Sequence, residues 1–331
     1  MVLTEFCQCP ECATASLAMI NSEQSALRTS AADPEELSVP SPSPSPSPSP
    51  SPSPSPSSAA TLPRPFLKWA GGKSYLLPEI RARVPAQYET YFEPFLGAGA
   101  VFFGLAPTRA ILGDVNAEVI NAFNVLKTQI EPLIESLLKH RHTKKYFYAL
   151  REIDRKPDYW VYTDIEKASR LMYLNKTCFN GLYRVNSRGE FNVPFGDYEK
   201  PRVVDEENLR LCHLALQGAE LRTGTYLDLE TEIRTGDFVY LDPPYAPLSP
   251  TANFAGYTKD GFSPKDQMEL AEFCKRLDKR GIKFLLSNSH TEFILDLYSA
   301  FKVETVEAPR AINSRSDKRG KVLEVLVRNY E

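Results

Sequence analysis

The sequence predicts an α/β fold built on an open, mostly parallel β-sheet. From about residue 65 onward, short apolar runs of strand character alternate with longer stretches of helical periodicity. A glycine-rich loop follows the first of these runs, and an Asp-Pro-Pro-Tyr tetrad follows a later one. Strands that alternate with helices favour parallel pairing, because parallel strands need crossover connections that helices provide.

The expected elements follow in order along the chain. Apolar, β-rich runs predict strands at 90–93, 110–113, 238–241, 283–287, 302–307 and 322–328. Helical spacing of apolar residues predicts helices at 75–84, 100–105, 117–139, 264–279 and 291–299, and a mixed helical region at 146–175 with a break at Pro157. Residues 178–201 are rich in Gly, Asn and aromatic residues, so we expect a loop or hairpin there.

Composition excludes several classes of protein. With 331 residues, 42% hydrophobic and 24% charged, the chain has an ordinary globular composition. No apolar run approaches the roughly 18–20 residues that a membrane-spanning helix needs, and the N-terminus does not have the pattern of a signal peptide. Six cysteines in a chain of this length do not indicate a disulfide scaffold. We therefore expect a cytoplasmic protein without membrane contacts.

Residues 1–63 have the composition of a disordered acidic tail. Eight consecutive Ser-Pro pairs occupy 41–56 and predict an extended, polyproline-biased linker. Cys7, Cys9 and Cys12 could begin a zinc site, but no fourth ligand lies near them in the sequence, so we favour unpaired thiols. Further along, 141–202 holds 13 Lys and Arg against 8 Asp and Glu, and 310–322 is also basic. These two local excesses permit a polyanionic partner although the net charge is −3.

The glycine-rich loop Glu93–Gly99 lies between a predicted strand and a predicted helix, and Asp114 ends the next strand. Such a loop lets the main chain approach a ligand closely. An acid at the end of the next strand commonly binds ribose hydroxyls, so the loop and Asp114 together suggest a nucleoside-containing cofactor. Phe102 occupies the third glycine position of a dinucleotide fingerprint, which disfavours NAD. Leu67 likewise breaks the phosphate-loop pattern before Gly72 and Lys73.

The tetrad Asp242-Pro243-Pro244-Tyr245 is the strongest chemical signal, because it follows a predicted strand directly. The exocyclic amine of a nucleobase is a poor nucleophile, since its lone pair is delocalised into the ring. A carboxylate and a rigid main-chain carbonyl that both accept from the NH2 group would localise that lone pair, and Asp242 and Pro243 offer these two acceptors. Tyr245 offers a flat face for a base turned out of a duplex. A simple turn with Tyr245 in the core is the competing interpretation.

Several motifs in order resemble the Dam-type, D12 class of DNA adenine-N6 methyltransferases. The resemblance rests on Phe66–Lys73, Glu93–Gly99, Gly113–Asn116, Tyr173–Asn175, Asn180–Arg184, Gly189–Gly196 and Asp242–Tyr245, followed by 246–249 and 251–254. It covers about 65–330 and implies a Rossmann-like, S-adenosylmethionine-dependent methyltransferase sheet with an inserted, mostly helical DNA-recognition domain that carries a β-hairpin. It further implies a catalytic domain of 64–117 and 205–331 and a target-recognition domain of 118–204.

The resemblance also implies roles for individual residues. It assigns catalysis to Asp242, Pro243, Pro244 and Tyr245, and the cofactor site to Trp69, Lys73, Glu93, Phe95, Gly97, Gly99, Asp114, Asn116, Tyr226 and Asp242. It assigns DNA contacts to Lys68, Phe179, Asn180, Leu182, Arg184, Pro194 and Tyr198. An arginine suits guanine because it can bond O6 and N7 together, and Phe179 matches an aromatic wedge in the base stack. Core packing of Phe179 is the competing interpretation.

The expected activity is transfer of a methyl group to N6 of adenine in duplex DNA at GATC, by base flipping and direct in-line transfer. We expect a monomer that needs no metal and is associated with the nucleoid. Two alternatives stay open: an RNA adenine or cytosine-N4 methyltransferase, because related tetrads occur there, and a non-catalytic DNA-binding regulator. The intact loop Glu93–Gly99 and the intact tetrad argue against the regulator.

Overall fold

The computed structural model describes residues 62–247, 262–309 and 321–331. All of them belong to one compact unit, Ser57–Glu331. The N-terminal cysteines, the Ser-Pro pairs, most of the basic stretch 310–322 and the family-like segment 251–254 lie outside the described residues.

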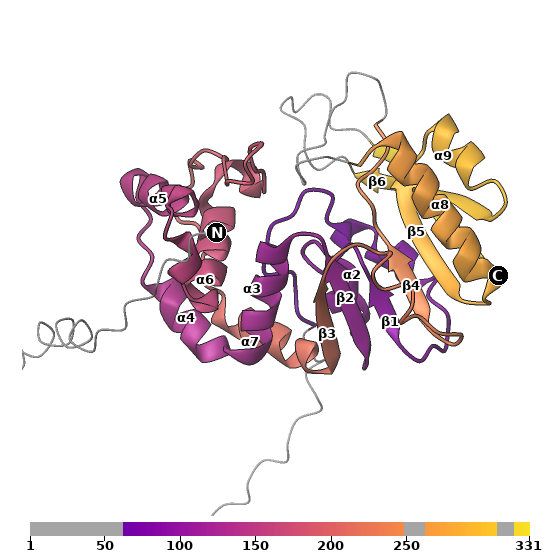
Figure 1. The fold of residues 1–331 in the computed structure, drawn as a ribbon, viewed down its shortest axis with the longest axis horizontal. Coiled ribbons are helices and arrows are strands. Elements are labelled where there is room, and N and C mark those ends of the chain that lie inside the picture. Colours follow the sequence, from indigo (N-terminus) through magenta and orange to yellow (C-terminus); the bar gives the residue numbers. More distant parts are fainter. Residues whose placement is uncertain (1–61, 248–261, 310–320) are drawn as a thin grey trace, which may run out of the picture. The chain divides into compact units, whose positions relative to one another are not determined.

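A seven-stranded sheet of order β3-β2-β1-β4-β5-β7-β6 organises the unit (Figure 1). The strands are β1 (Tyr91–Glu93), β2 (Ala110–Asp114), β3 (Ala219–Thr223), β4 (Phe238–Leu241), β5 (Lys283–Ser289), β6 (Lys302–Pro309) and β7 (Lys321–Arg328). Strands β1 to β5 pair in parallel, whereas β7 is antiparallel to both β5 and β6. The predicted mostly parallel α/β sheet is therefore confirmed.

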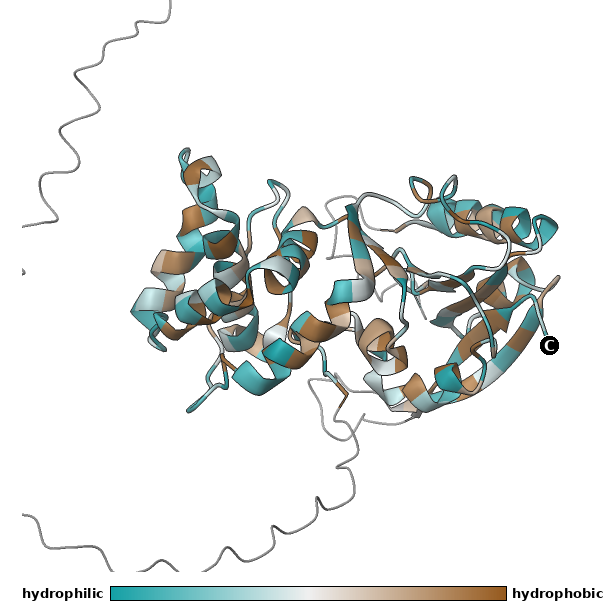
Figure 2. Cartoon of the chain, turned by 90° about the horizontal axis from the view of Figure 1, so that it is seen from below, coloured by the Kyte–Doolittle hydropathy of each residue, from teal (hydrophilic) through white to brown (hydrophobic). Residues whose placement is uncertain are grey.

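Helices cover both faces of the sheet, because alternate strand residues point to opposite sides. In β4, Phe238 and Tyr240 belong to one apolar cluster, and Val239 and Leu241 belong to the other. The first cluster includes residues of α1 (Leu77–Arg81), α2 (Ala100–Leu105) and α3 (Ala117–Thr128), and the second includes residues of α8 (Pro264–Lys279) and α9 (Glu292–Leu297). Hydrophobic residues accordingly line the strands and the inner faces of the helices (Figure 2).

A group of helices lies beside the β3 edge of the sheet (Figure 1). It comprises α4 (Ile130–Leu138), α5 (Lys144–Arg151), α6 (Asp164–Thr177) and α7 (Glu206–Ala215), and α3 packs against α6 and α7. Helix α6 begins at a capping box formed by Thr163 and Glu166. The expected β-hairpin after α6 is reduced to two isolated bridges, Cys178↔Phe195 and Val185↔Phe191, around a short 3-10 turn at Phe179–Gly181.

Two of the expected helices differ from the structure, and two further elements were not expected. The single helix expected at 117–139 is two helices that break at Gln129, because Pro132 in the first turn of α4 has no N–H to continue the ladder of α3. The helix expected at 75–84 is a 3-10 turn, Lys73–Tyr75, followed by the short α1. Neither α7 nor β3 was predicted. Only the first residue of β3 is buried, so the strand carries little of the apolar signal that marks buried strands.

Candidate active site

The glycine-rich loop, Asp114 and the Asp-Pro-Pro-Tyr tetrad meet at one edge of the sheet. Strands β2, β1 and β4 are parallel neighbours, and these three features follow the carboxyl ends of β1, β2 and β4. The chain continues from β1 to β2 on one side and reaches β4 on the other, so the edge is a topological switch point. Ligands of doubly wound sheets bind at such points.

The main chain of the glycine loop is fixed from two sides. The Gly97 N–H donates to Asp114 Oδ2 at 2.9 Å, and the Asn116 N–H donates to Asp114 Oδ1 at 2.9 Å. Gly97 and Gly99 have φ of +49° and +68°, which favour glycine. A Cβ atom on Gly97 would lie 2.8 Å from Trp69 Cδ1, so the indole packs directly against the loop. Asn116 Oδ1 caps α3.

Asp242 is held through one of its two carboxylate oxygens. Lys73 Nζ lies 2.7 Å from Oδ1, and the Ser287 hydroxyl donates to the same oxygen at 2.8 Å. Among the described residues, Oδ2 has no hydrogen-bond partner, and the side chain is 18% exposed. Burial raises the pKa of Asp242 above its ordinary value, although Lys73 opposes this shift. Oδ2 can therefore accept a hydrogen bond from a ligand at a site that is partly shielded from water.

Two buried amides fix the tetrad's main chain. Gln267 of α8 donates to the Pro244 carbonyl at 2.8 Å, and Asn288 of β5 donates to Gln267 Oε1 at 3.0 Å. Asn288 also accepts from the Ala246 N–H at 3.1 Å. In the described part of the chain, no donor contacts the Pro243 carbonyl. Sequence reasoning missed both amides. The only signal for them in the sequence is a polar residue at a position of α8 or β5 where the pattern predicts an apolar one.

Tyr245 is oriented by Glu324 of β7, which sequence reasoning also missed. The Tyr245 hydroxyl donates to Glu324 Oε2 at 2.7 Å, and the Tyr75 hydroxyl donates to Oε1 at 2.5 Å. Lys73 Nζ lies 4.5 Å from the centre of the Tyr245 ring, within cation–π range. The signal in the sequence is one buried acid within the apolar run of β7.

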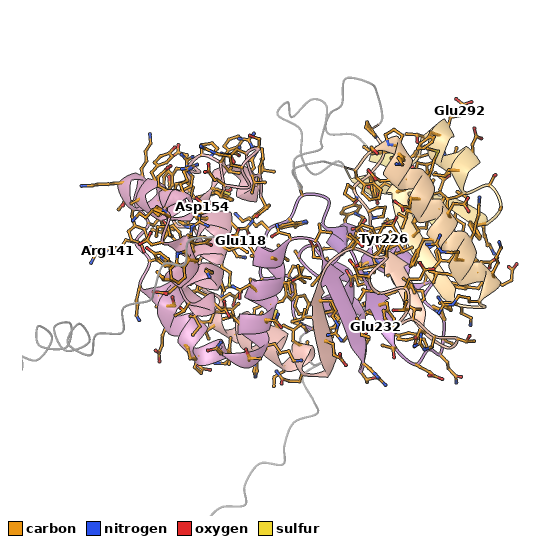
Figure 3. All side chains as sticks on the ribbon, viewed as in Figure 1. Glu118, Arg141, Asp154, Tyr226, Glu232 and Glu292 are labelled. Carbon is orange, nitrogen blue, oxygen red and sulfur yellow. The ribbon has the colours of Figure 1, made fainter. Side chains whose placement is uncertain are left out.

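Two of the expected cofactor residues, Glu93 and Tyr226, have side chains that are buried against other side chains. The Glu93 carboxylate accepts from the Tyr91 hydroxyl at 2.7 Å, and the residue is 2% exposed. Tyr226 packs between Phe95 and Phe273, with ring centres 5.6 and 5.0 Å away. Tyr226 thus belongs to the apolar cluster between the sheet and α8 (Figure 3). The direct contact of these two residues with a cofactor stays a prediction.

Burial of Glu93 predicts a pH-dependent stability. Burial raises the pKa of Glu93 from 4.5 to about 8, so the folded protein binds a proton between these values that the unfolded chain has lost. This contribution is complete below pH 4.5 and is lost as the pH rises through 8. Thermal or urea unfolding of the wild type should show a loss on the order of a few kcal/mol over this range.

Glu93→Gln, which mimics the protonated carboxyl, should flatten that slope. The control is Glu269→Gln, since Glu269 is an exposed glutamate on α8. A Glu93→Gln protein whose stability falls with pH as steeply as the wild type and the control would contradict the assignment.

A family model for D12 class N6 adenine-specific DNA methyltransferases matches residues 69–312. The chain belongs to this family. It is 43% identical over 271 residues to type II methyltransferase M1.LlaDCHI of Lactococcus lactis subsp. cremoris, across 81% of this chain and 95% of that protein. It is 39% identical over 289 residues to type II methyltransferase M.MjaIII of Methanocaldococcus jannaschii, across 81% and 99%. It is 37% identical over 267 residues to DNA adenine methylase of Escherichia coli K12, across 80% and 94%.

The predicted family and enzyme class are thus confirmed, and the chain is an adenine-specific DNA methyltransferase. Membership implies dependence on S-adenosylmethionine. The structure fits that cofactor, because the loop around Gly97 and the Asp114 carboxylate lie where doubly wound sheets hold a nucleoside. Among the described residues, no group of His, Cys, Asp and Glu is arranged to hold a metal ion, and no helix is long and apolar enough to cross a membrane.

Most residues that the resemblance assigns to DNA contacts of this methyltransferase lie at the surface. Lys68, Asn180, Arg184 and Pro194 are exposed, and the Phe179 side chain is 52% exposed. That exposure argues against the core-packing interpretation of Phe179.

Buried Asn175 joins the two segments that carry these residues. It accepts from the Lys68 N–H at 2.7 Å and donates to the carbonyls of Lys68 and Gly181. Lys68 Nζ also lies 4.4 Å from the centre of the Tyr198 ring. Tyr198 and Leu182 are half-buried.

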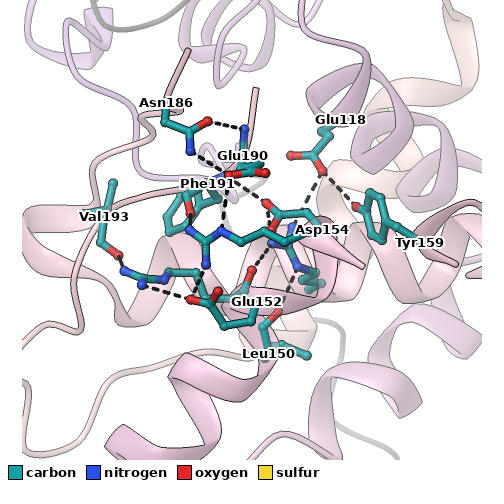
Figure 4. Close-up of polar contacts among 12 residues, drawn as sticks. Glu118, Leu150, Glu152, Asp154, Tyr159, Asn186, Glu190, Phe191 and Val193 are labelled. Carbon is teal, nitrogen blue, oxygen red and sulfur yellow. Dashed lines mark hydrogen bonds and ion pairs between the residues drawn. The ribbon is translucent and has the colours of Figure 1, made fainter. Parts of the chain in front are cut away.

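An ionic network, largely buried, holds residues 186–193 of the methyltransferase against α6 and the 3-10 turn Glu152–Arg155 (Figure 4). Arg170 pairs with Asp154 at 2.7 Å, and Asp154 accepts from the Phe191 N–H at 2.8 Å. Arg155 contacts Glu190 at 3.3 Å and donates to the Phe191 carbonyl.

Ion pairs in this network and outside it remove several cations from the local basic excess. Five arginines of 141–202 have acidic partners: Arg151, Arg155, Arg170, Arg188 and Arg202. Fewer cations are therefore free for phosphates than the sequence count indicates.

Proposed function

We propose that this enzyme methylates N6 of adenine in duplex DNA at GATC, with the target base turned out of the helix. The observation that carries the proposal is the arrangement of acceptors at the tetrad. Lys73 and Ser287 occupy Asp242 Oδ1, while Oδ2 and the Pro243 carbonyl have no donor among the described residues. An exocyclic NH2 group offers two donors, which match these two acceptors.

S-adenosylmethionine, when bound, would supply a sulfonium-linked methyl group: as the amine nitrogen bonds to the methyl carbon, the C–S bond would break to leave a neutral thioether and the amine would lose one proton. Trp69, Lys73, Phe95, Gly97, Gly99, Asp114 and Asn116 are the residues that we expect to hold it. Asp242 and Pro243 would draw the amine protons toward themselves and so restore lone-pair density on nitrogen. Tyr245, whose hydroxyl is tied to Glu324, would offer its ring face to the extruded adenine. The chain's contribution is alignment and preorganised electrostatics.

Helices α4 to α6 and the segment after α6 support a target-recognition domain of 118–204. Exposed Phe179 could fill the space that adenine leaves, and Arg184 could bond a guanine in the major groove. Unpaired surface lysines of 141–202 would contact phosphates, so affinity should fall with salt. We infer that the enzyme acts as a monomer on chromosomal DNA in the cytoplasm and is associated there with the nucleoid.

The test is a methyl-transfer assay with labelled cofactor on three substrates: a GATC duplex, a duplex of equal composition without GATC, and an RNA of matching sequence. Mass spectrometry of the digested product should show N6-methyladenine from the GATC duplex alone. Label in RNA, or N4-methylcytosine in any product, would overturn the proposal. DNA binding without transfer on any substrate would support a regulator instead.

Arg184→Ala should relax selectivity at one guanine of the site by about 1–3 kcal/mol, because a bidentate contact is lost. In the structure the Arg184 Nε donates to Asn192 Oδ1 at 2.7 Å, which directs the guanidinium. The measurement compares kcat/KM on GATC with duplexes changed at each position. Arg188→Ala on the same segment is the control, since Arg188 is exposed and pairs with Glu190. Equal weakening on every sequence would assign Arg184 to a phosphate.

A further inference from the structure

One aromatic pair joins two parts of the protein. The first is the edge of the sheet that carries the expected cofactor residues, and the second is the segment 179–198 that we expect to contact DNA, called the recognition segment below. The rings of Trp69 and Tyr183 stack with centres 5.2 Å apart and planes 25° apart. Trp69 precedes the 3-10 turn that carries Lys73, and Tyr183 lies between Leu182 and Arg184. Nothing in the proposed function gives Tyr183 a role.

At the cofactor site, the Trp69 ring packs directly against the glycine loop, so its position depends on that of the loop. The ring lies so close to Gly97 that an added Cβ would be 2.8 Å from Cδ1 and 2.9 Å from Nε1. The Gly97 N–H is itself bound to Asp114. A displacement of this loop on cofactor binding must therefore move the indole, because closely packed groups transmit displacement.

On the recognition side, Tyr183 is buried and fixed by two further groups. Its hydroxyl donates to Glu118 Oε2 at 3.2 Å, and its ring meets Phe191 edge-on at 5.9 Å. Glu118 also accepts from the Tyr159 hydroxyl at 2.9 Å, and Figure 4 shows it beside the network that holds residues 186–193. Movement of the Tyr183 ring would thus reach both Arg184 and the segment around Phe191.

We propose that Tyr183 is a positioning residue that couples occupancy of the cofactor site to placement of the recognition segment, through its stack on Trp69. The inference rests on the proposed function, since it needs both ligands. It implies that DNA tightens cofactor binding and that the cofactor tightens DNA binding by the same factor, because coupling between two binding sites is reciprocal.

The experiment measures the affinity of the full chain for S-adenosylhomocysteine by calorimetry, alone and with a saturating GATC duplex. In the wild type the duplex should tighten binding roughly five-fold or more, the lower range of such couplings. Tyr183→Met, which keeps apolar volume but has no ring face, should reduce the effect to less than about two-fold, with cofactor affinity in the absence of DNA near wild type. Tyr183→Phe keeps the stack and should retain the coupling.

A spectroscopic readout distinguishes coupling from a loss of fold. The chain has two tryptophans, and Trp160 is 78% exposed, so Trp160→Phe leaves Trp69 as the sole emitter. In that background the duplex should shift the Trp69 emission, and Tyr183→Met should abolish the shift. Tyr148→Leu in α5 is the control for loss of a half-buried tyrosine from the helical group. If Tyr183→Met does not fold, Trp69→Met tests the stack from its other side by calorimetry. Because Trp69 is itself an expected cofactor residue, only the ratio of its affinities with and without the duplex is compared.

Three results would overturn the proposal in an enzyme that methylates DNA. The first is a wild type whose cofactor affinity is the same with and without the duplex. The others are a Tyr183→Met protein that keeps the wild-type ratio of these two affinities, and one in which the ratio falls no further than in the Tyr148→Leu control. A wild type that neither binds S-adenosylhomocysteine nor methylates any duplex would instead refute the proposed function.

Discussion

Asp242→Asn is expected to lower turnover on the order of 100- to 1,000-fold while DNA affinity stays near that of the wild type. The amide cannot present a charged acceptor to the amine, and its Nδ2 adds a donor where the chemistry needs an acceptor. Lys73 keeps its bond to the Gly71 carbonyl at 2.6 Å, so the cation retains one partner after the substitution. Turnover is measured as single-turnover methyl transfer to the GATC duplex, and affinity by fluorescence anisotropy of the same duplex.

The matched control is Glu272→Gln, an acid-to-amide change at a surface pair with Lys275 on α8. It should leave both turnover and affinity unchanged. A protein with Asp242→Asn that bound DNA and methylated it at the wild-type rate would show that the tetrad carboxylate is not an acceptor for the amine. Loss of DNA binding together with turnover would instead indicate that Asp242 maintains the fold of the edge through Lys73 and Ser287.

Local signals in the sequence predicted those elements that carry their own start and stop chemistry. Helix α8 begins and ends where expected because Ser263 and Asp266 form a capping box and Pro264 occupies the first turn. Helix α2 likewise matches its predicted range. The expected strand 283–287 extends two residues further because β7 pairs with it as far as Ser289, and only tertiary pairing decides where a strand ends.

The site could be predicted in part for the same reason. Glycines and acids that directly follow strands converge because parallel strands end at one edge, so Gly97, Asp114 and Asp242 were found. Glu324 was not, since it contacts Tyr245 across 79 positions of sequence and its only local signal is that an acid interrupts the apolar run of β7. For Gln267 and Asn288, too, the only local signal is a polar residue where the pattern predicts an apolar one. Residues that orient a catalytic loop from other elements are visible only when packing is known.

Arg170→Met is expected to destabilise the fold by about 3–5 kcal/mol, since it leaves buried acids without their cation. Arg170 is 2% exposed, pairs with Asp154 at 2.7 Å and donates to the carbonyls of Leu150 and Arg151. The measurement is urea unfolding of both proteins. Arg210→Met is the control, because Arg210 pairs with Glu131 and Glu206 at the surface, where water screens the charges, and the change should cost far less stability. Equal costs at the two positions would contradict a buried, desolvated pair.

The double variant Arg170→Met with Asp154→Leu removes the whole ion pair, whereas Arg170→Met alone leaves the Asp154 charge unpaired. If Arg170→Met loses stability mainly because the Asp154 carboxylate is left unpaired, removal of Asp154 should recover part of that stability. A buried ion pair can often be replaced by apolar residues without a loss of stability. Target selection should fall in the double variant, since the Phe191 N–H loses its acceptor when Asp154 is gone. Stability would then return in part while discrimination between GATC and altered sites is reduced. That separation would show that the buried pair serves placement of the recognition segment more than it serves the stability of the fold.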